Sequence, residues 1–179
     1  MANCSQNLNS ITVGCDNNKG GLFTLWLFPY YKEDGITKTF TLTKDADTEE
    51  IKGITLDGVT LIPFQFRKQS SSATSTYTLD DANGVSYVTT ELALRFARQD
   101  AAKRLAINSL LKSQVAGIYK DNNGKYVFIG EEEPVTATAG TSESGTAFTD
   151  ANQYTLTLSD TTLAFPSFVT DGAMEELLG

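Results

Sequence analysis

The chain has 179 residues, 40% of them apolar and 20% charged, a composition that suits one folded domain and excludes a chain disordered by composition. It contains no histidine, which excludes Ser-His and Cys-His nucleophile pairs and histidine metal sites. The formal net charge is −8, and residues 126–179 carry the whole excess, with nine Asp and Glu and no Lys or Arg. A net acidic chain is a poor candidate for binding the phosphates of a nucleic acid.

Targeting and redox features are few. No stretch approaches the roughly 18 apolar residues of a membrane span, and the first residues lack the basic and apolar regions of a secretory signal. We therefore expect synthesis in the cytoplasm and no membrane partner. Cys4 and Cys15 are the only cysteines. They allow one bridge, but free thiols are favoured in a reducing compartment, and two thiolates are too few for structural zinc. No metal or cofactor is predicted.

Residues 1–21 are polar and rich in Gly and Asn, which predicts an irregular N-terminal arm. The run at 22–30 is apolar and aromatic and predicts a strand, with Phe23, Trp26, Phe28 and Tyr30 in the core or on a strand face. Strands are also expected over 36–43, 51–56 and 59–68. Asp57-Gly58 predicts a hairpin turn between the last two, and Pro63 predicts an edge strand or a bulge.

The middle of the chain predicts more strands and one helix. Residues 69–76 suit either a loop or an exposed strand, and 80–84 predict a turn. Apolar and polar residues then alternate up to Phe96, which predicts a long strand with Val88, Thr90, Leu92, Leu94 and Phe96 on one face. Residues 100–114 predict the helix, with Asp100 as N-cap and a narrow apolar stripe of Ala101, Leu105, Leu110 and Leu111.

The last third holds a hairpin, a long loop and a tail. Residues 115–130 predict a hairpin that turns at Asp121–Gly124. Residues 131–153 show no clear element, and a loop of that length is often functional or ordered by a partner. A strand is expected at 154–160. Residues 161–179 are too apolar for a free tail and should dock on this chain or a neighbour.

Together these elements predict a mainly β protein with one helix (α+β): a β-sandwich or barrel with one packed helix over residues 22–160, between an arm at 1–21 and a tail at 161–179. Many strand edges, an arm, a long loop and an apolar tail favour assembly with other chains.

The sequence contains one acidic and one basic cluster. Glu131, Glu132 and Glu133 are adjacent, so their side chains diverge, and a solvated loop is favoured over a cation site. Arg95, Arg98, Lys103 and Arg104 form a basic cluster where the long strand meets the helix. Contact with acids on this chain or a neighbouring subunit is favoured there over contact with nucleic acid. The glycines at 139–148 lack the Walker spacing. No catalytic residue is predicted, and a structural or binding role is favoured over an enzyme.

Four segments carry a resemblance to a known family. They are CDNNKGGLFTLWLFPY near the start, ELALRFARQDAAKRLAINSLL in the strand–helix block, VAGIYKDNNGKYVFIG in the hairpin, and TAGTSESGTAFTDANQYTLTL after it. They resemble virion proteins encoded by phages and prophages of Bacteroidetes, most closely tail tube proteins. The resemblance covers about 110 residues and is most specific over 115–158.

The resemblance implies a β-sandwich or barrel with a flanking helix, and a subunit that closes into stacked, hexameric rings of a virion tail. Its partners would be copies of itself and other tail or neck proteins, and DNA would pass without tight binding. It also implies an acidic lumen, for which Glu131, Glu132 and Glu133 are the candidates. The candidate subunit contacts are Arg95, Arg98, Arg104, Phe148, Phe165, Phe168, Leu177 and Leu178.

Two alternatives remain open at this stage. A head–tail connector or tail-completion protein would share the fold. A capsid-decoration or carbohydrate-binding β-sandwich is the alternative from another class, and aromatic residues gathered on one exposed face would favour carbohydrate binding.

Overall fold

A computed structural model describes residues 10–179 and shows a mainly β, α+β architecture of two sheets and two helices, as predicted for the class. The strands are β1 (Leu22–Pro29), β2 (Phe40–Lys44), β3 (Ile51–Leu56), β4 (Ile62–Gln65), β5 (Ser72–Asp80), β6 (Val85–Ala97), β7 (Val115–Asp121), β8 (Tyr126–Ile129), β9 (Thr136–Glu143), β10 (Gln153–Thr162) and β11 (Phe168–Val169). The helices are α1 (Ala101–Leu110) and α2 (Asp171–Leu178). Within residues 10–179 neither is long and apolar enough to cross a membrane.

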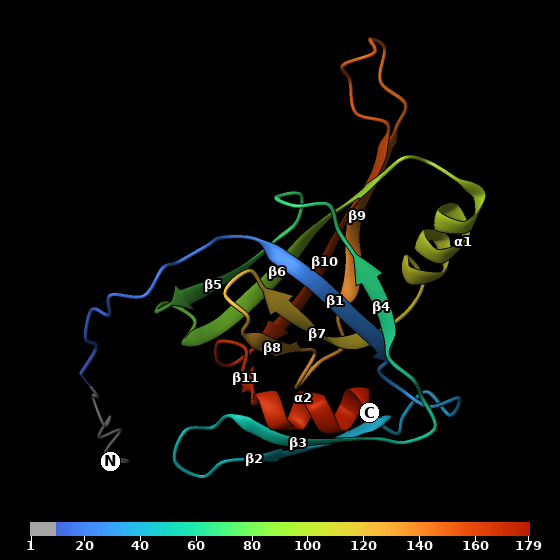
Figure 1. Ribbon diagram of the computed structural model, residues 1–179. Helices are drawn as coiled ribbons and strands as arrows, with labels where there is room; N and C mark the ends of the chain where they lie inside the picture. The colour runs from blue at the N-terminus through green and yellow to red at the C-terminus, as the bar shows by residue number, and fades with distance from the viewer. Residues whose placement is uncertain (1–9) are drawn as a thin grey trace.

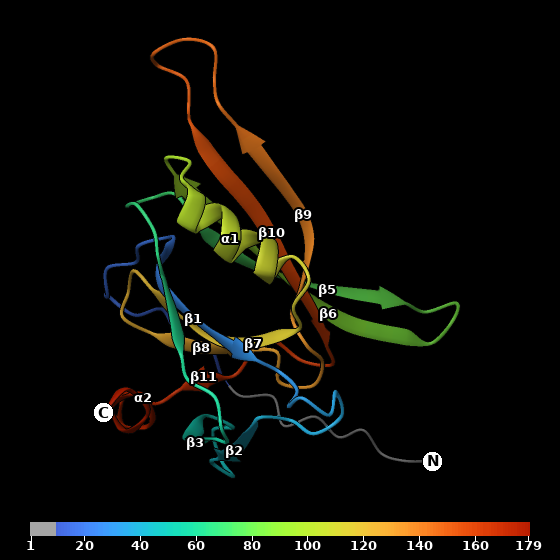
Figure 2. The ribbon, with the colours of Figure 1, turned by 90° about the vertical axis from the view of Figure 1, so that its right-hand side faces the viewer.

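The two sheets face each other as layers of a sandwich (Figures 1 and 2). One has seven strands in the order β2-β3-β11-β8-β7-β1-β4, and the other has four in the order β5-β6-β10-β9. All strand pairs in the described chain are antiparallel except that of β11 with β3. Two edge strands of the larger sheet, β2 and β4, and two of the smaller, β5 and β9, therefore have one unpaired side within the described chain.

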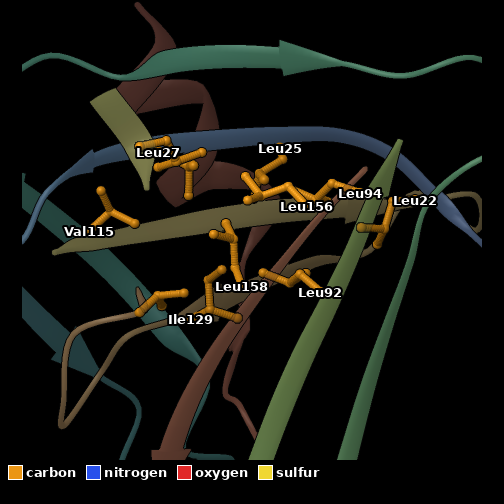
Figure 3. Packing of buried hydrophobic residues seen from close by; sticks show 11 residues of the cluster. Leu22, Leu25, Leu27, Leu92, Leu94, Val115, Ile129, Leu156 and Leu158 are labelled. Carbon is orange, nitrogen blue, oxygen red and sulfur yellow. The ribbon is translucent and has the colours of Figure 1, made fainter. Parts of the chain in front are cut away.

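Leucine-rich strand faces fill the space between the sheets (Figure 3). Leu25 and Leu27 of β1 meet Leu92 and Leu94 of β6, and Leu158 of β10 lies among them; all are at most 2% exposed. Burial of each such side chain contributes about 1.5–3 kcal/mol relative to exposure. The alternating face predicted for β6 is confirmed, since Val88, Thr90, Leu92 and Leu94 are buried while Glu91 and Arg95 are exposed.

A second, aromatic cluster covers the opposite face of the seven-stranded sheet. Phe28, Phe40 and Phe128 pack edge to face or tilted, with ring centroids 5.3–6.2 Å apart. Met174 of α2 is buried in the same cluster. Because both faces are covered, β1, β7 and β8 are apolar almost throughout, as expected of strands buried on two sides. Of the four aromatic residues at 22–30, Phe23 is the exception and is exposed.

The observed strands test three sequence predictions for residues 57–76. The predicted hairpin at Asp57-Gly58 is wrong, because β3 pairs with β2 and β11 while β4 crosses to the far edge and pairs with β1. Pro63 does lie on an edge strand, as predicted, where its missing N–H costs no ladder bond. Of the two readings left open for residues 69–76, the exposed strand is the observed one, in β5.

The predicted apolar stripe of α1 is also wrong. Asp100 is the N-cap as expected, and its carboxylate accepts a bond from the Lys103 N–H. The buried residues are Ile107 and Leu110, whereas Leu105 is 67% exposed and Leu111, after the helix, is 44% exposed. Only the C-terminal turn of α1 packs against the core between the sheets, so the helix has no apolar stripe buried along its length.

The segments predicted as loop and tail are largely regular structure. Residues 131–153 contain β9, which pairs with β10 along its length, so the structureless loop shrinks to the hairpin turn and the Glu131–Pro134 segment. Residues 161–179 contain β11 and a second helix, α2. They dock on this chain: Val169 pairs with Ile51, and Ala173 and Met174 are buried. The prediction of only one helix is wrong for the same reason.

Gly117 lets β7 approach β1 closely in the larger sheet. A Cβ there would lie 2.4 Å from the Trp26 carbonyl oxygen and 2.6 Å from Cδ2 of Leu27. We expect Gly117→Ala to lower the free energy of unfolding by about 3 kcal/mol or more in urea denaturation, because the backbone of β1 must move. Gly53→Ala in β3 is the control: its Cβ would meet Thr43 Cβ at an ordinary 3.6 Å. Equal losses in both variants would contradict the interpretation.

Candidate assembly surfaces

The hairpin of β9 and β10 projects beyond the rest of the molecule (Figures 1 and 2). Its turn is built by Asp150, whose carboxylate accepts bonds from the backbone N–H of Thr146 (2.8 Å) and Ala147 (2.7 Å). These bonds lower the pKa of Asp150. Phe148 lies in this turn with its side chain fully exposed. An ordered turn thus presents a large apolar side chain to solvent, a typical contact residue.

A basic hollow of about 540 Å³ lies at the base of the projecting part of this hairpin, where β9 ends and β10 begins. We call it the arginine hollow. It is formed where the loop after β4 meets the end of β6 and the start of β10, and its lining includes Arg67, Gln69, Arg95, Arg98, Gln99 and Asp150. Arg95 and Arg98, predicted as one cluster, are therefore brought together, and Arg67 joins them from a distant part of the sequence.

The backbone of the arginine hollow is held in an uncommon conformation. Gln69 and Arg98 have φ angles of 61° and 63°, in the left-handed region that costs a non-glycine residue about 1–2 kcal/mol. At Arg98 the cost is offset by two bonds: its N–H donates to the Asn152 carbonyl at 2.7 Å, and its carbonyl accepts from Lys103 Nζ at 3.0 Å. Gln99 Nε2 bonds Ser142 Oγ and the Glu143 carbonyl, which ties the hollow to the hairpin.

None of the arginines forms an ion pair within residues 10–179. The four ion pairs there all use lysines: Lys32–Asp57, Lys44–Glu131, Lys52–Asp45 and Lys103–Asp100. The chain has four arginines, three of which line the hollow, and the fourth, Arg104, is exposed on α1 nearby. This end of the molecule therefore presents arginines that form no ion pair within the described chain, with Asp150 as the one carboxylate in the lining of the hollow.

The Glu131–Glu133 segment forms bonds within the chain. Glu131 pairs with Lys44 and accepts a bond from Ser167 Oγ at 3.0 Å, and Glu132 accepts from the Leu163 N–H at 3.1 Å. Two of the three candidate lumen acids thus hold the C-terminal segment against the body. Glu133 is exposed and has no ion pair among the described residues. Of the three glutamates, Glu133 is therefore the one free to face the lumen of an assembled tube. That such a lumen exists stays a prediction.

Asp160 of β10 is a buried carboxylate that the sequence did not single out. It is 5% exposed; its Oδ2 accepts from the Gly130 N–H at 2.9 Å, and its Oδ1 has no partner. Burial raises the pKa of Asp160 above its ordinary value, partly opposed by the Gly130 bond. No group of three or more Cys, Asp or Glu suited to a metal ion occurs among residues 10–179.

The other candidate contacts lie near the C-terminus. Phe165 and Phe168 are 61% and 50% exposed on the segment around β11, and Leu178 is 50% exposed at the end of α2, while Leu177 is partly buried against the aromatic cluster. The structure does not bring them to the hairpin turn or the arginine hollow, which lie at the other end (Figure 1). Cys15 is exposed, and Cys4, its only possible partner, lies outside the described residues.

Comparison with family models, curated proteins and solved structures returned no match to this chain. The candidate surfaces therefore rest on this chain's own geometry.

Sequence reasoning missed Arg67, because its proximity to Arg95 depends on β4 crossing to the edge beside β1. It also missed Asp160, since a carboxylate at the end of a strand ordinarily faces solvent. The register offered one signal: Asp160 follows Leu156 and Leu158 at period two, on the buried face of β10.

Asp160→Asn tests the buried charge. A pKa raised in the folded state means that stability falls as pH rises from the ordinary Asp pKa, near 3.9, through the raised value. We expect the variant to lose this fall, so its stability relative to wild type should increase with pH across that window, measured by urea unfolding.

Asp150→Asn is the control of opposite sign. The lowered pKa of Asp150 contributes stability above the ordinary value that is lost as pH falls, so this variant should be less stable than wild type at neutral pH. Identical pH profiles for wild type and Asp160→Asn would overturn the assignment of a buried, destabilising charge.

Proposed function

We propose that this chain is a structural subunit of a phage virion that associates with its own copies into the stacked rings of a tail tube. The observation that carries the proposal is the projecting β9–β10 hairpin, whose ordered turn exposes Phe148 away from the body. The exposed phenylalanine does not stabilise the single chain, whereas a neighbouring copy can bury it.

Strand edges and the N-terminal segment support the same function. The outer sides of β4, β5 and β9 are not paired within the described chain, so their backbone groups are available to another strand. Residues 10–20 are exposed, with Ile11 and Val13 each 99% exposed, and the segment joins the body through bonds of Lys19 and Gly20 to Asn123 and Asn122. An extended arm with apolar side chains at period two suits addition to a neighbour's sheet.

The distribution of exposed aromatic residues argues against the carbohydrate-binding alternative. Phe23 lies on β1, Tyr77 on β5, Phe148 in the hairpin turn, Phe165 before β11 and Phe168 in β11. A sugar-binding platform requires several rings on one face. The nearest alternative in the same class is a head–tail connector. It would also form rings, but those rings would bind other virion proteins instead of stacking on further rings of the same chain.

The test is assembly of the purified full chain. We expect rings or tubes in negative-stain microscopy and concentration-dependent association in sedimentation velocity. A strictly monomeric chain at every concentration and salt condition would overturn the proposal.

Phe148→Ser probes the hairpin turn. Phe148 is exposed in the single chain and would be buried between assembled copies, so its loss should raise the concentration needed for assembly about tenfold or more. The melting temperature of the monomer should not change, because the side chain is fully exposed there. Ile36→Ser, at an 81% exposed position in another turn, is the matched control and should assemble like wild type. Equal behaviour of the two variants would remove the hairpin from the interface.

A further inference from the structure

Both helices carry charges of the unfavourable sign at one end. The first turn of α1 contains no acidic residue but holds Lys103 and is followed by Arg104, near the positive end of the helix dipole. Asp100 neutralises only Lys103. The last turn of α2 contains no basic residue but holds Glu175 and Glu176, near the negative end of its dipole. Each helix end would be stabilised by the charges that the other carries.

The arginine hollow, which adjoins the N-cap of α1, and the helix α2 lie on opposite sides of the molecule. In both views the loop after β4, the end of β6 and the base of the β9–β10 hairpin, which together form the arginine hollow, lie toward the top, whereas α2 lies at the bottom (Figures 1 and 2). A contact between them within one chain is therefore excluded, but a contact between two copies placed end to end is geometrically open.

The chemistry of the two surfaces is complementary. Arginine presents a planar fork of donors that binds carboxylates in bidentate pairs. Arg67, Arg95 and Arg98 line one hollow and form no ion pair among residues 10–179. Asp150 also lines the hollow, but its carboxylate accepts the two backbone bonds of the hairpin turn. Asp171, Glu175 and Glu176 of α2 are all exposed, and none forms an ion pair in the described chain.

We propose that the arginine hollow receives the carboxylates of α2 from a second copy of this chain, so that copies stack end to end. Because the two surfaces differ, the contact is heterologous and leaves one of each unused at the ends of every stack, ready for the next copy. The inference rests on the proposed self-assembly and specifies which surfaces meet between successive copies.

The test reverses each charge separately in the full chain. The hollow variant is Arg67→Glu with Arg95→Glu; Arg98 is kept because of its φ of 63°. The helix variant is Glu175→Arg with Glu176→Arg. Alone, each variant faces a like charge at the contact, and we expect its association in sedimentation velocity to weaken about tenfold or more.

Mixing the two variants gives the decisive result. An alternating stack pairs the acidic hollow of one with the basic α2 of the other, and every second contact is the wild-type pair, so an equimolar mixture should assemble again. Rising NaCl should weaken the wild-type contact, as expected for exposed charges.

Matched controls change net charge elsewhere. Lys112→Glu with Lys125→Glu mimics the charge change of the hollow variant, and Glu33→Arg with Asp81→Arg mimics that of the helix variant, all at exposed positions. Both should assemble like wild type. If a charge-reversal variant fails to fold, as judged by its melting curve, Arg67→Gln with Arg95→Gln and Glu175→Gln with Glu176→Gln should each still weaken association.

The outcomes are distinguishable. Wild type that never associates would overturn the proposed function and this contact together. Wild type that assembles, with both variants unchanged or with a mixture that stays dissociated, would overturn this contact alone. Binding of a short DNA duplex that the hollow variant loses while its assembly stays intact would identify a phosphate site and likewise overturn the contact.

Discussion

The pairing of β1 with β7 is the constraint on which the remaining elements depend. These two strands are adjacent interior strands of the larger sheet and are buried on both faces, with Leu25 and Leu27 turned toward the smaller sheet and Phe28 toward the aromatic cluster. Gly117 permits their close approach. Because one pair of strands anchors both cores, it fixes the four-stranded sheet on one side and α2 on the other.

This arrangement gives the molecule two unlike ends. The four-stranded sheet carries β6 and β10 outward to the arginine hollow and the projecting hairpin, while β3 and β11 hold α2 at the opposite end. Glu131 and Glu132 strengthen the latter by tying residues 163–167 to the body. The acidic excess of the last third is thus partly structural, and its remaining exposed part is divided between α2, Glu133 and the hairpin residues Glu143 and Asp150. Placement, more than the total of −8, decides what the charge can do.

The sequence predicted elements whose burial leaves a periodic or strongly apolar pattern. β6 has one buried face, so its alternation is visible, and β1 and β7 are apolar on both faces. β9 was missed because most of its residues are small or hydroxyl-bearing and exposed, so neither period nor hydrophobicity indicates a strand; its pairing with β10 alone makes it one. The α1 stripe was misassigned because only its last turn packs. Arg67 joined the basic cluster through a long-range crossover that no local pattern encodes.

The hairpin and the arginine hollow are mechanically one unit. Asn152 receives the N–H of Arg98 through its carbonyl and that of Gln99 through its Oδ1, while Gln99 reaches back to Ser142 and Glu143 on the other strand. A contact that moved the hairpin would therefore change the positions of Arg98 and its neighbours, and an acid bound in the hollow would stiffen the hairpin base. The proposed contacts between copies through Phe148 and through the arginines would then favour each other, since each pre-orders the residues that the other needs. Cooperative growth, in which rings and stacks form together, is what such a shared base would produce.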